Sequence, residues 1–483
     1  MEEKIIFEYK SEGRPSIKFP DNNFSYKSPE ELLDKSLICN EACGDFPELS
    51  EPEVVRHFTR LSERNYNVDA NFYPLGSCTM KYNPKVNEQV SRFPGFTDIH
   101  PYQDEEDIQG ILELLYQLGE YLKDLSGLPG VTLQPAAGAH GELTGLFLMK
   151  AYFNEHDPKR NVILIPDSAH GTNPASAKTA GFETIQIKSN PAGNTDPEQL
   201  KKYIDDRFAG IMLTIPNTLG LFDRHILDVS KIVHDAGGFL YMDGANMNAL
   251  MGKVIPADLG VDVMHFNLHK TFSTPHGGGG PGGGPITVSS ALEKYLPVPV
   301  ITRRKDKYSL DYDRPSSIGK VKEFYGNIGV CVKAYSYFKA LGSSGLKKVT
   351  EFAVLNANYI RKSLEDIFKT AYPRICMHEC VLTNENQEQY GIKTLNIAKR
   401  LLDYGIHAPT VYFPLIVHEA IMIEPTETES KEALDNFIEI MKKIAEESKS
   451  APEIVLNAPH KMFRKKLDEV TAARNPILKW RKE

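Results

Sequence analysis

The strongest constraint on the fold is an alternation of short apolar segments and helical segments between residues 161 and 266. The apolar segments predict strands at 161–165, 183–187, 210–215, 239–242 and 261–266. The segments between them predict helices at 173–180, 197–205 and 227–236. Such alternation is typical of a mostly parallel sheet with helices on both faces, because parallel neighbours are joined by right-handed crossovers. We therefore predict an α/β fold.

Polar residues follow several of these strands directly. His170 comes after the first strand, Asp243 ends the fourth, and Lys270 follows the fifth within four residues. Asn217 and Thr218 come after the third strand. Ligands in parallel sheets bind beyond the carboxyl ends of the strands, so these side chains are expected near one another. Each has an ordinary alternative: an aspartate there often caps the next helix, and a single lysine is usually a solvated charge. Their common position favours a shared site.

The residue types at this edge match the needs of pyridoxal 5'-phosphate (PLP). Lys270 could form an imine, and an ionised Asp243 could keep a pyridine nitrogen protonated, which makes the ring an electron sink. His170 could stack on the ring. The residues 136–141, small except for His140, open a helix whose free N–H groups suit a phosphate, although a tight helix entry without a ligand has the same pattern.

Two loop-like segments can each be interpreted in two ways. Residues 277–280 and 282–284 are all glycine, which indicates either a flexible linker or a place where a ligand comes close to the backbone. The stretch 71–84 is rich in Gly, Ser, Asn and Pro, and this pattern alone favours a surface turn over a loop that lines a substrate pocket. The basic cluster 303–305 is either a solvated face or part of a carboxylate-binding pocket.

Composition excludes several classes of protein. The chain has 483 residues and a net charge of −8 without a basic stripe, so we expect neither nucleic-acid nor membrane binding. It lacks both an apolar run of about 20 residues and a signal-peptide pattern, and its six cysteines suit a reducing cytoplasm. The pairs Cys39/Cys43 and Cys376/Cys380 lack the companions of zinc motifs, so no metal is expected.

The rest of the chain suggests four regions. We predict an N-terminal arm at 1–65, which includes a helix at 51–64, and a PLP-binding large domain at 66–325. Helices at 108–125, 325–341, 345–368 and 431–448 and strands at 380–383, 411–414 and 420–423 are also expected. Strands among helices after residue 325 predict a smaller α+β domain at 326–450, followed by a C-terminal tail at 451–483.

Five stretches resemble the glycine decarboxylase P-protein family of the glycine cleavage system. They are Tyr73 to Pro84, Gln134 to Glu142, Ser168 to Ala177, Asp243 to Asn246 and Leu268 to Pro285. The last, with Leu-His-Lys-Thr-Phe and its glycine run, is long and specific. Asn457 to His460 also fits the family.

The resemblance implies a fold-type-I PLP enzyme with assigned site residues. Lys270 matches the Schiff-base lysine, Asp243 the partner of the pyridine nitrogen, and His170 the ring-stacking position. The phosphate loop and further cofactor contacts are expected at Ala137, Gly138, Ala139, Asn246 and His269.

The resemblance also implies a reaction and partners. The family decarboxylates glycine and transfers the aminomethyl group to the lipoyl arm of the H-protein, as glycine dehydrogenase (aminomethyl-transferring). The single-chain form of the family is much longer, so this chain is similar to subunit 2 of the two-chain form, which carries PLP. A related subunit 1 is then needed, with two copies of each chain in a heterotetramer. The alternatives are another PLP-dependent amino-acid decarboxylase or aminotransferase, and a non-catalytic scaffold.

Overall fold

The computed structural model describes residues 3–9, 20, 23–38, 47–277 and 282–479. The pair Cys39/Cys43 and the glycines at 278–280 lie outside the described residues. The chain divides into two compact units, residues 1–70 and 71–483. The four-region division predicted above stays a prediction.

The described residues of the first unit contain short helices. Its elements are η1 (Ile6–Glu8), α1 (Pro29–Leu32), η2 (Lys35–Leu37) and α2 (Glu51–Ser62). Helix α2 confirms the helix predicted at 51–64, and it begins where the Ser50 backbone N–H donates to the Glu53 carboxylate at 3.0 Å. Arg60 on this helix forms an ion pair with Glu3 at 2.7 Å.

The second unit is built on a seven-stranded sheet with the order β1-β7-β6-β5-β4-β2-β3. Its strands are β1 (Gly130–Thr132), β2 (Val162–Pro166), β3 (Glu183–Ile187), β4 (Phe208–Thr214), β5 (Phe239–Gly244), β6 (Val263–Phe266) and β7 (Ile286–Val288). Strands β2 to β6 are parallel, which confirms the prediction, and β7 runs antiparallel to both β6 and β1. The sequence did not indicate β1 and β7, because three residues are too short for a periodic signal.

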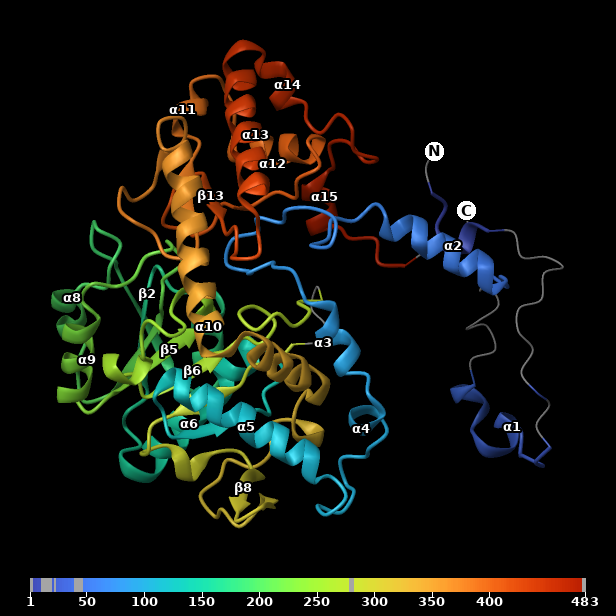
Figure 1. Ribbon diagram of the computed structural model, residues 1–483, viewed down its shortest axis with the longest axis vertical. Helices are drawn as coiled ribbons and strands as arrows, with labels where there is room; N and C mark the ends of the chain where they lie inside the picture. Colours follow the sequence, from blue (N-terminus) through green and yellow to red (C-terminus); the bar gives the residue numbers. More distant parts are fainter. Residues whose placement is uncertain (1–2, 10–19, 21–22, 39–46, 278–281, 480–483) are drawn as a thin grey trace. The chain divides into compact units, whose positions relative to one another are not determined.

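Helices cover both faces of this sheet (Figure 1). They are α5 (Gln109–Ser126), α6 (Gly138–His156), α7 (Thr172–Thr179), α8 (Pro197–Lys202) and α9 (Ile226–Asp235), with α3 (Lys85–Val90) and α4 (Pro94–Thr97) before them. Successive residues of a strand point to opposite faces. In β2, Leu164 belongs to the core formed with α5 and α9, whereas Ile163 and Ile165 belong to the core formed with α6 and α7.

A second sheet of four short antiparallel strands follows later in the chain, in the order β10-β11-β13-β12. Its strands are β10 (Lys369–Thr370), β11 (Cys380–Thr383), β12 (Thr410–Val411) and β13 (Ala420–Ile423), and β8 (Val300–Arg304) and β9 (Lys307–Asp311) form a separate hairpin. The helices here are α10 (Ile328–Leu364), α11 (Glu385–Glu388), α12 (Thr394–Asp403), α13 (Lys431–Ser450), α14 (Pro452–Leu456) and α15 (Glu469–Arg474). The remaining single turns are η3 (Met247–Ala249), η4 (Pro256–Leu259), η5 (Glu293–Tyr295) and η6 (Glu323–Tyr325).

Helix α10 links the regions of the two sheets (Figure 1). It contacts α5 and α3 beside the large sheet and α13 and β11 beside the small one. At Gly342 the backbone leaves the helical conformation, with φ 59° and ψ −179°. Two helices were expected here with a break between 341 and 345, and this kink is the break.

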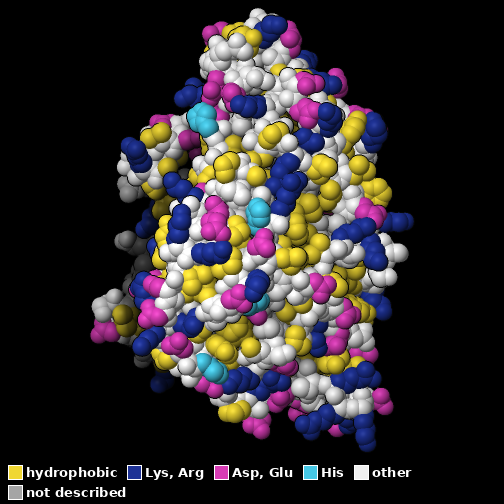
Figure 2. All heavy atoms as spheres, turned by 90° about the vertical axis from the view of Figure 1, so that its left-hand side faces the viewer, with side chains coloured by type: hydrophobic (Ala, Val, Ile, Leu, Met, Phe, Trp, Pro, Cys, Tyr) yellow, Lys and Arg dark blue, Asp and Glu magenta, His cyan; other side chains and the backbone are white. Residues whose placement is uncertain are grey.

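Charged side chains of both signs are interspersed on the face shown in Figure 2, where no stripe of one sign stands out. Among the helices of the described residues, none combines the length and the apolar character needed to cross a bilayer.

Candidate active site

The structure brings Lys270, Asp243 and His170 together at the carboxyl edge of the parallel strands. Burial lowers the pKa of His170, the nearby Asp243 carboxylate opposes that shift, and the Lys270 amine adds to it. Both groups therefore lie within electrostatic reach of the imidazole ring. His170 also packs edge-on against Phe413, with ring centroids 6.2 Å apart.

Asp243 is held as a buried carboxylate by partners that the sequence did not reveal. His265 Nε2 lies 3.2 Å from Oδ1, and Asn173 Nδ2 donates to Oδ2 at 3.1 Å. Burial opposes ionisation, but the charge and hydrogen bond of His265 outweigh it, so the pKa of Asp243 lies below its ordinary value. Tyr241 contacts the other ring nitrogen of His265 at 3.0 Å. The result is a fixed negative charge at the end of β5.

His170 is oriented by a second buried carboxylate, that of Glu142 on α6. Thr172 Oγ1 lies 2.8 Å from His170 Nδ1 and donates to Glu142 at 2.6 Å. Ser176 donates to the other oxygen of Glu142 at 2.8 Å. The ring of His170 is thus fixed through the first turn of α7, as a ring that stacks on a flat ligand requires.

The residues expected to hold a phosphate form the start of α6. Ala137 is the N-cap residue and gives no side-chain hydrogen bond to the helix, so the first N–H groups lack a side-chain cap. Small residues are needed here because other backbone comes close. A Cβ on Gly284 would lie 1.9 Å from the Ala137 carbonyl oxygen, and one on Gly138 would lie 2.3 Å from Asn267 Oδ1. Gly284, at least, serves close packing of backbone on backbone.

Buried polar atoms without partners lie in the segment that follows β6, and those of Asn267 and His269 are near this helix start. Among the described residues, Asn267 Oδ1, His269 Nδ1 and Thr274 Oγ1 are buried and make no hydrogen bond. Such atoms are rare in folded proteins and usually indicate a missing partner. Burial, with nearby His276 and Lys270, lowers the pKa of His269 to about 3, so its ring is neutral and can donate one N–H. The N–H of His269 and the free helix N–H groups are donors that fit a bound phosphate, whereas Asn267 Oδ1 accepts and calls for a donor.

The loop at 73–81 lies over Lys270. The Lys270 amine donates to the backbone carbonyl of Ser77 at 2.7 Å. Ser77 and Thr79 have φ values of 64° and 49°, which residues other than glycine rarely adopt. The surface turn favoured by the pattern alone is therefore wrong. Loop composition does not distinguish a turn in solvent from one held against a site.

Two buried glutamates that the sequence did not indicate hold this loop. The Ser77 N–H donates to Glu379 at 2.7 Å, and the N–H and hydroxyl of Thr79 donate to Glu424 at 2.8 and 2.6 Å. Burial raises the pKa of both glutamates, most strongly that of Glu379. Their contacts with the loop span about 300 residues of sequence or more, so no local pattern could have found them.

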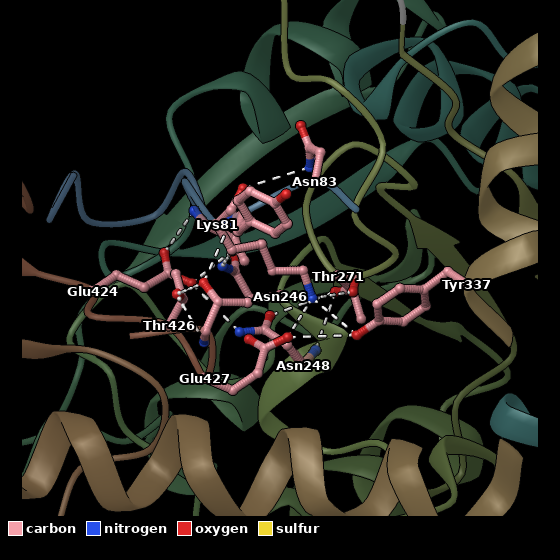
Figure 3. A network of polar contacts seen from close by, with 12 residues as sticks. Lys81, Asn83, Asn246, Asn248, Thr271, Tyr337, Glu424, Thr426 and Glu427 are labelled. Carbon is pink, nitrogen blue, oxygen red and sulfur yellow. Dashed lines mark hydrogen bonds and ion pairs between the residues drawn. The ribbon is translucent and has the colours of Figure 1, made fainter. Parts of the chain in front are cut away.

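Figure 3 shows the polar network that extends from Glu424 to Lys81. The buried Lys81 amine contacts the Glu427 carboxylate and the backbone carbonyl of Thr271, the residue after Lys270. Asn246 Nδ2 donates to the Thr79 hydroxyl at 3.0 Å, and its contact with a cofactor stays a prediction. In this structure Asn246 therefore supports the loop over Lys270.

Several other candidates have ordinary structural roles. Asn217 donates to the Gly193 carbonyl and Thr218 to the Ser168 carbonyl, so both fasten loops. The basic residues 303–305 are exposed at the turn of the β8–β9 hairpin, which is the solvated alternative. Cys376 and Cys380 are buried free thiols.

Family models match most of the chain. The model described as Glycine cleavage system P-protein matches residues 21–311, and the one described as Glycine dehydrogenase, C-terminal domain, matches residues 349–465. A protein of Caldanaerobacter subterraneus subsp. tengcongensis, named probable glycine dehydrogenase (decarboxylating) subunit 2, is 55% identical over 480 residues, or 99% of each chain.

Solved structures give the fold independently. A crystal structure of glycine decarboxylase (P-protein) of the glycine cleavage system, in inhibitor-bound form, is similar with a TM-score of 0.72 and 19% identity over 86% of this chain and 95% of that one. A NifS-like protein is similar with a TM-score of 0.59 and 15% identity over 78% and 99% of the two chains. The predicted fold class, that of fold-type-I PLP enzymes, is confirmed.

Proposed function

The chain belongs to the glycine cleavage system P-protein family, and from that premise we propose that it is subunit 2 of a glycine dehydrogenase (decarboxylating). It removes CO₂ from glycine and passes the aminomethyl group to the lipoyl arm of the H-protein. The 55% identity to a relative of that name favours this reaction over another PLP-dependent decarboxylase or aminotransferase.

The observation that carries the proposal is the arrangement at one edge of the sheet. An amine, a buried carboxylate, an imidazole ring and a helix start without a side-chain cap converge there. These groups fit PLP, which when bound supplies an electron sink for the electron pair left by the loss of CO₂. A scaffold protein has no need of this set.

Each residue has a part in holding the cofactor. Lys270 would hold it covalently, and the start of α6 at 137–139, with the neutral His269, would bind its phosphate. The charge of Asp243 would keep a proton on the ring nitrogen, and His170 would cover the ring face. Because His265 and Asn173 fix Asp243, this charge is in place before the cofactor arrives.

The proposal includes partners. A chain of the subunit 2 type works with a subunit 1, and we propose two copies of each. The lipoylated H-protein must bring its disulfide to the carbon that has lost CO₂. The mouth of the site must therefore admit a tethered arm.

The replacement Lys270→Ala tests the proposal, with Lys201→Ala at an exposed ion pair as the control. We expect the subunit 1 complex of the wild type and of the control to bind PLP with a visible band that borohydride bleaches. The Lys270→Ala complex should fold but lack that band, and it should lose the exchange of labelled CO₂ into glycine. A wild-type complex that takes up no PLP would contradict the proposal.

Dependence on the carrier separates the P-protein reaction from its rival. Exchange should require lipoylated H-protein and should vanish with the unlipoylated form. Carrier-independent decarboxylation, or amino transfer to a 2-oxo acid, would instead support another PLP enzyme.

A further inference from the structure

Glu379 and Glu424 face each other at the end of the small sheet. Strands β11 and β13 are antiparallel with Cys380 opposite Ile423, so the next pair along the ladder is Glu379 with Glu424. Like charges directly opposite in a sheet are destabilising. Here both carboxylates are also buried, at 2% and 0% exposure, where an unpaired charge is most costly. Such a pair needs a reason to be kept.

The two carboxyl groups are held differently. Glu424 accepts hydrogen bonds from the Thr79 N–H, the Thr79 hydroxyl and Asn248 Nδ2. Glu379 accepts one, from the Ser77 N–H. Among the described residues, neither carboxyl group forms an ion pair with a lysine or an arginine. The Lys270 amine contacts the Ser77 carbonyl instead. More hydrogen bonds stabilise the charged form, which favours Glu424 as the carboxylate and Glu379 as the protonated partner.

A neutral histidine next to Glu379 also lacks a polar partner. His378 Nε2 lies 3.8 Å from Glu379 Oε2, but neither ring nitrogen makes a hydrogen bond among the described residues. This contact is not an ion pair, because burial and the Lys270 amine lower the pKa of His378 to about 3. The other titratable groups that interact with Glu379 are Glu424, Lys270, Cys78, Cys376 and Cys380.

Resting on the proposed function, we propose that Glu379 is the acid that protonates the departing lipoyl sulfur, and that Glu424 opposite keeps the proton on Glu379. The transfer step must consume a proton. The carbon that has lost CO₂ forms a bond to one sulfur, the S–S bond breaks, and its electron pair stays on the second sulfur. That thiolate takes the proton from the Glu379 carboxyl, which is left as a carboxylate and regains a proton from solvent.

The protonation state is tested by infrared difference spectroscopy on the PLP-loaded complex with subunit 1. At about pH 8.5, a carboxyl with a pKa of about 7, such as that of Glu429, is mostly ionised. At this pH the difference spectrum of wild type minus Glu379→Gln should still contain the band of a protonated carboxyl. The control variant Glu447→Gln removes a carboxylate that is paired with Arg400, and its own difference spectrum against the wild type should lack that band. A Glu379→Gln difference spectrum with no such band would overturn the proposal.

Kinetics test the role of the proton. Glutamine still accepts the Ser77 N–H, so Glu379→Gln removes the acid and keeps the loop contact. We expect kcat for aminomethyl transfer to fall about 100-fold or more, while PLP affinity stays within about 3-fold, and Glu379→Asp to recover part of the rate. A kcat of Glu379→Gln within about 3-fold of the wild type would contradict the role.

The partner acid is tested through the pH profile. Burial and the charge of Glu424 both raise the pKa of Glu379, and Glu424→Gln removes the second cause. It should therefore move the alkaline limb of kcat to lower pH, by about one unit. An unmoved limb would refute the role given to Glu424. The two proposals fail separately: without PLP binding or exchange in the wild type the function is wrong, whereas an active wild type with unaffected Glu379 variants rejects this inference alone.

Discussion

At the scale of single residues, the site depends on buried charges whose partners come from distant parts of the chain. Asp243 is paired with His265, and Lys81 with Glu427. Taking one member of a buried pair away leaves the other charge without compensation, which costs more than the pair itself contributes. These residues therefore matter for stability as well as for the shape of the site.

The Lys81–Glu427 pair gives a test of this coupling. Lys81→Met should lower the free energy of unfolding by about 3–5 kcal/mol, because Glu427 would stay buried without its cation. The double variant Lys81→Met/Glu427→Gln should recover part of this loss. Urea unfolding of the four proteins of the cycle measures the coupling, and purely additive losses would disprove it.

Glu429 gives a prediction about pH. Burial raises its pKa from the ordinary value of 4.5 to about 7, so between these values the folded chain holds a proton that the unfolded chain has lost. Stability therefore falls as pH rises through this window. Glu429→Gln removes the effect, so its stability advantage over wild type should grow by about 2 kcal/mol between about pH 4.5 and 8. Denaturant unfolding across this range measures it, and an advantage independent of pH would contradict the assignment.

At the scale of elements, the ends of strands and helices carry the site and their middles carry the core. Asp243 ends β5, Lys270 follows β6, Glu379 precedes β11 and Glu424 follows β13. Helix α6 points its N-terminus at the same region, and its glycines permit the approach of the segment that precedes β7. The site is thus a meeting of element ends.

Gly138→Ala tests the start of α6. Its Cβ would overlap the Asn267 side chain, and such overpacking typically costs about 1–3 kcal/mol. We expect PLP affinity to fall at least about tenfold in a fluorescence titration. Gly110→Ala near the start of α5 meets no atom within 4 Å, so it should leave affinity unchanged and preserve or slightly raise stability. Equal effects of the two changes would argue against a phosphate site here.

At the scale of the whole molecule, one site is assembled from two sheets and the loop at 73–81. Lys270 comes from the large sheet, the two glutamates come from the small one, and Ser77 on the loop contacts both Lys270 and Glu379. The long helix α10 contacts elements beside both sheets. Substitutions that destabilise the small sheet should therefore weaken cofactor binding.

Leu382→Ala in β11 tests this dependence. The side chain is fully buried, so its loss should cost about 2–5 kcal/mol of stability, and loosening β11 should also weaken PLP binding through Glu379. The control Leu227→Ala on α9 removes an exposed leucine and should change stability by no more than about 0.5 kcal/mol. Thermal unfolding and PLP titration of both variants decide the question, and a destabilised variant with unchanged PLP affinity would show that the small sheet acts independently.

The sequence by itself determined the fold class and the carboxyl edge where the site lies. Parallel strands that are buried on both faces appear in the sequence as apolar runs. Because these runs alternate with helices, only a few topologies of the sheet are compatible with the sequence. The same local signals placed His170, Asp243 and Lys270 at strand ends. A resemblance carried by contiguous motifs added the family.

Only the tertiary structure decided what surrounds those residues. His265 beside Asp243, and Glu379 and Glu424 under the loop at 73–81, meet through contacts between segments far apart in the chain. A short motif records a residue's neighbours along the chain, whereas burial and charge pairing depend on its neighbours in space. For that reason the loop looked like a solvated turn in the sequence and proved to be fastened over the candidate catalytic lysine.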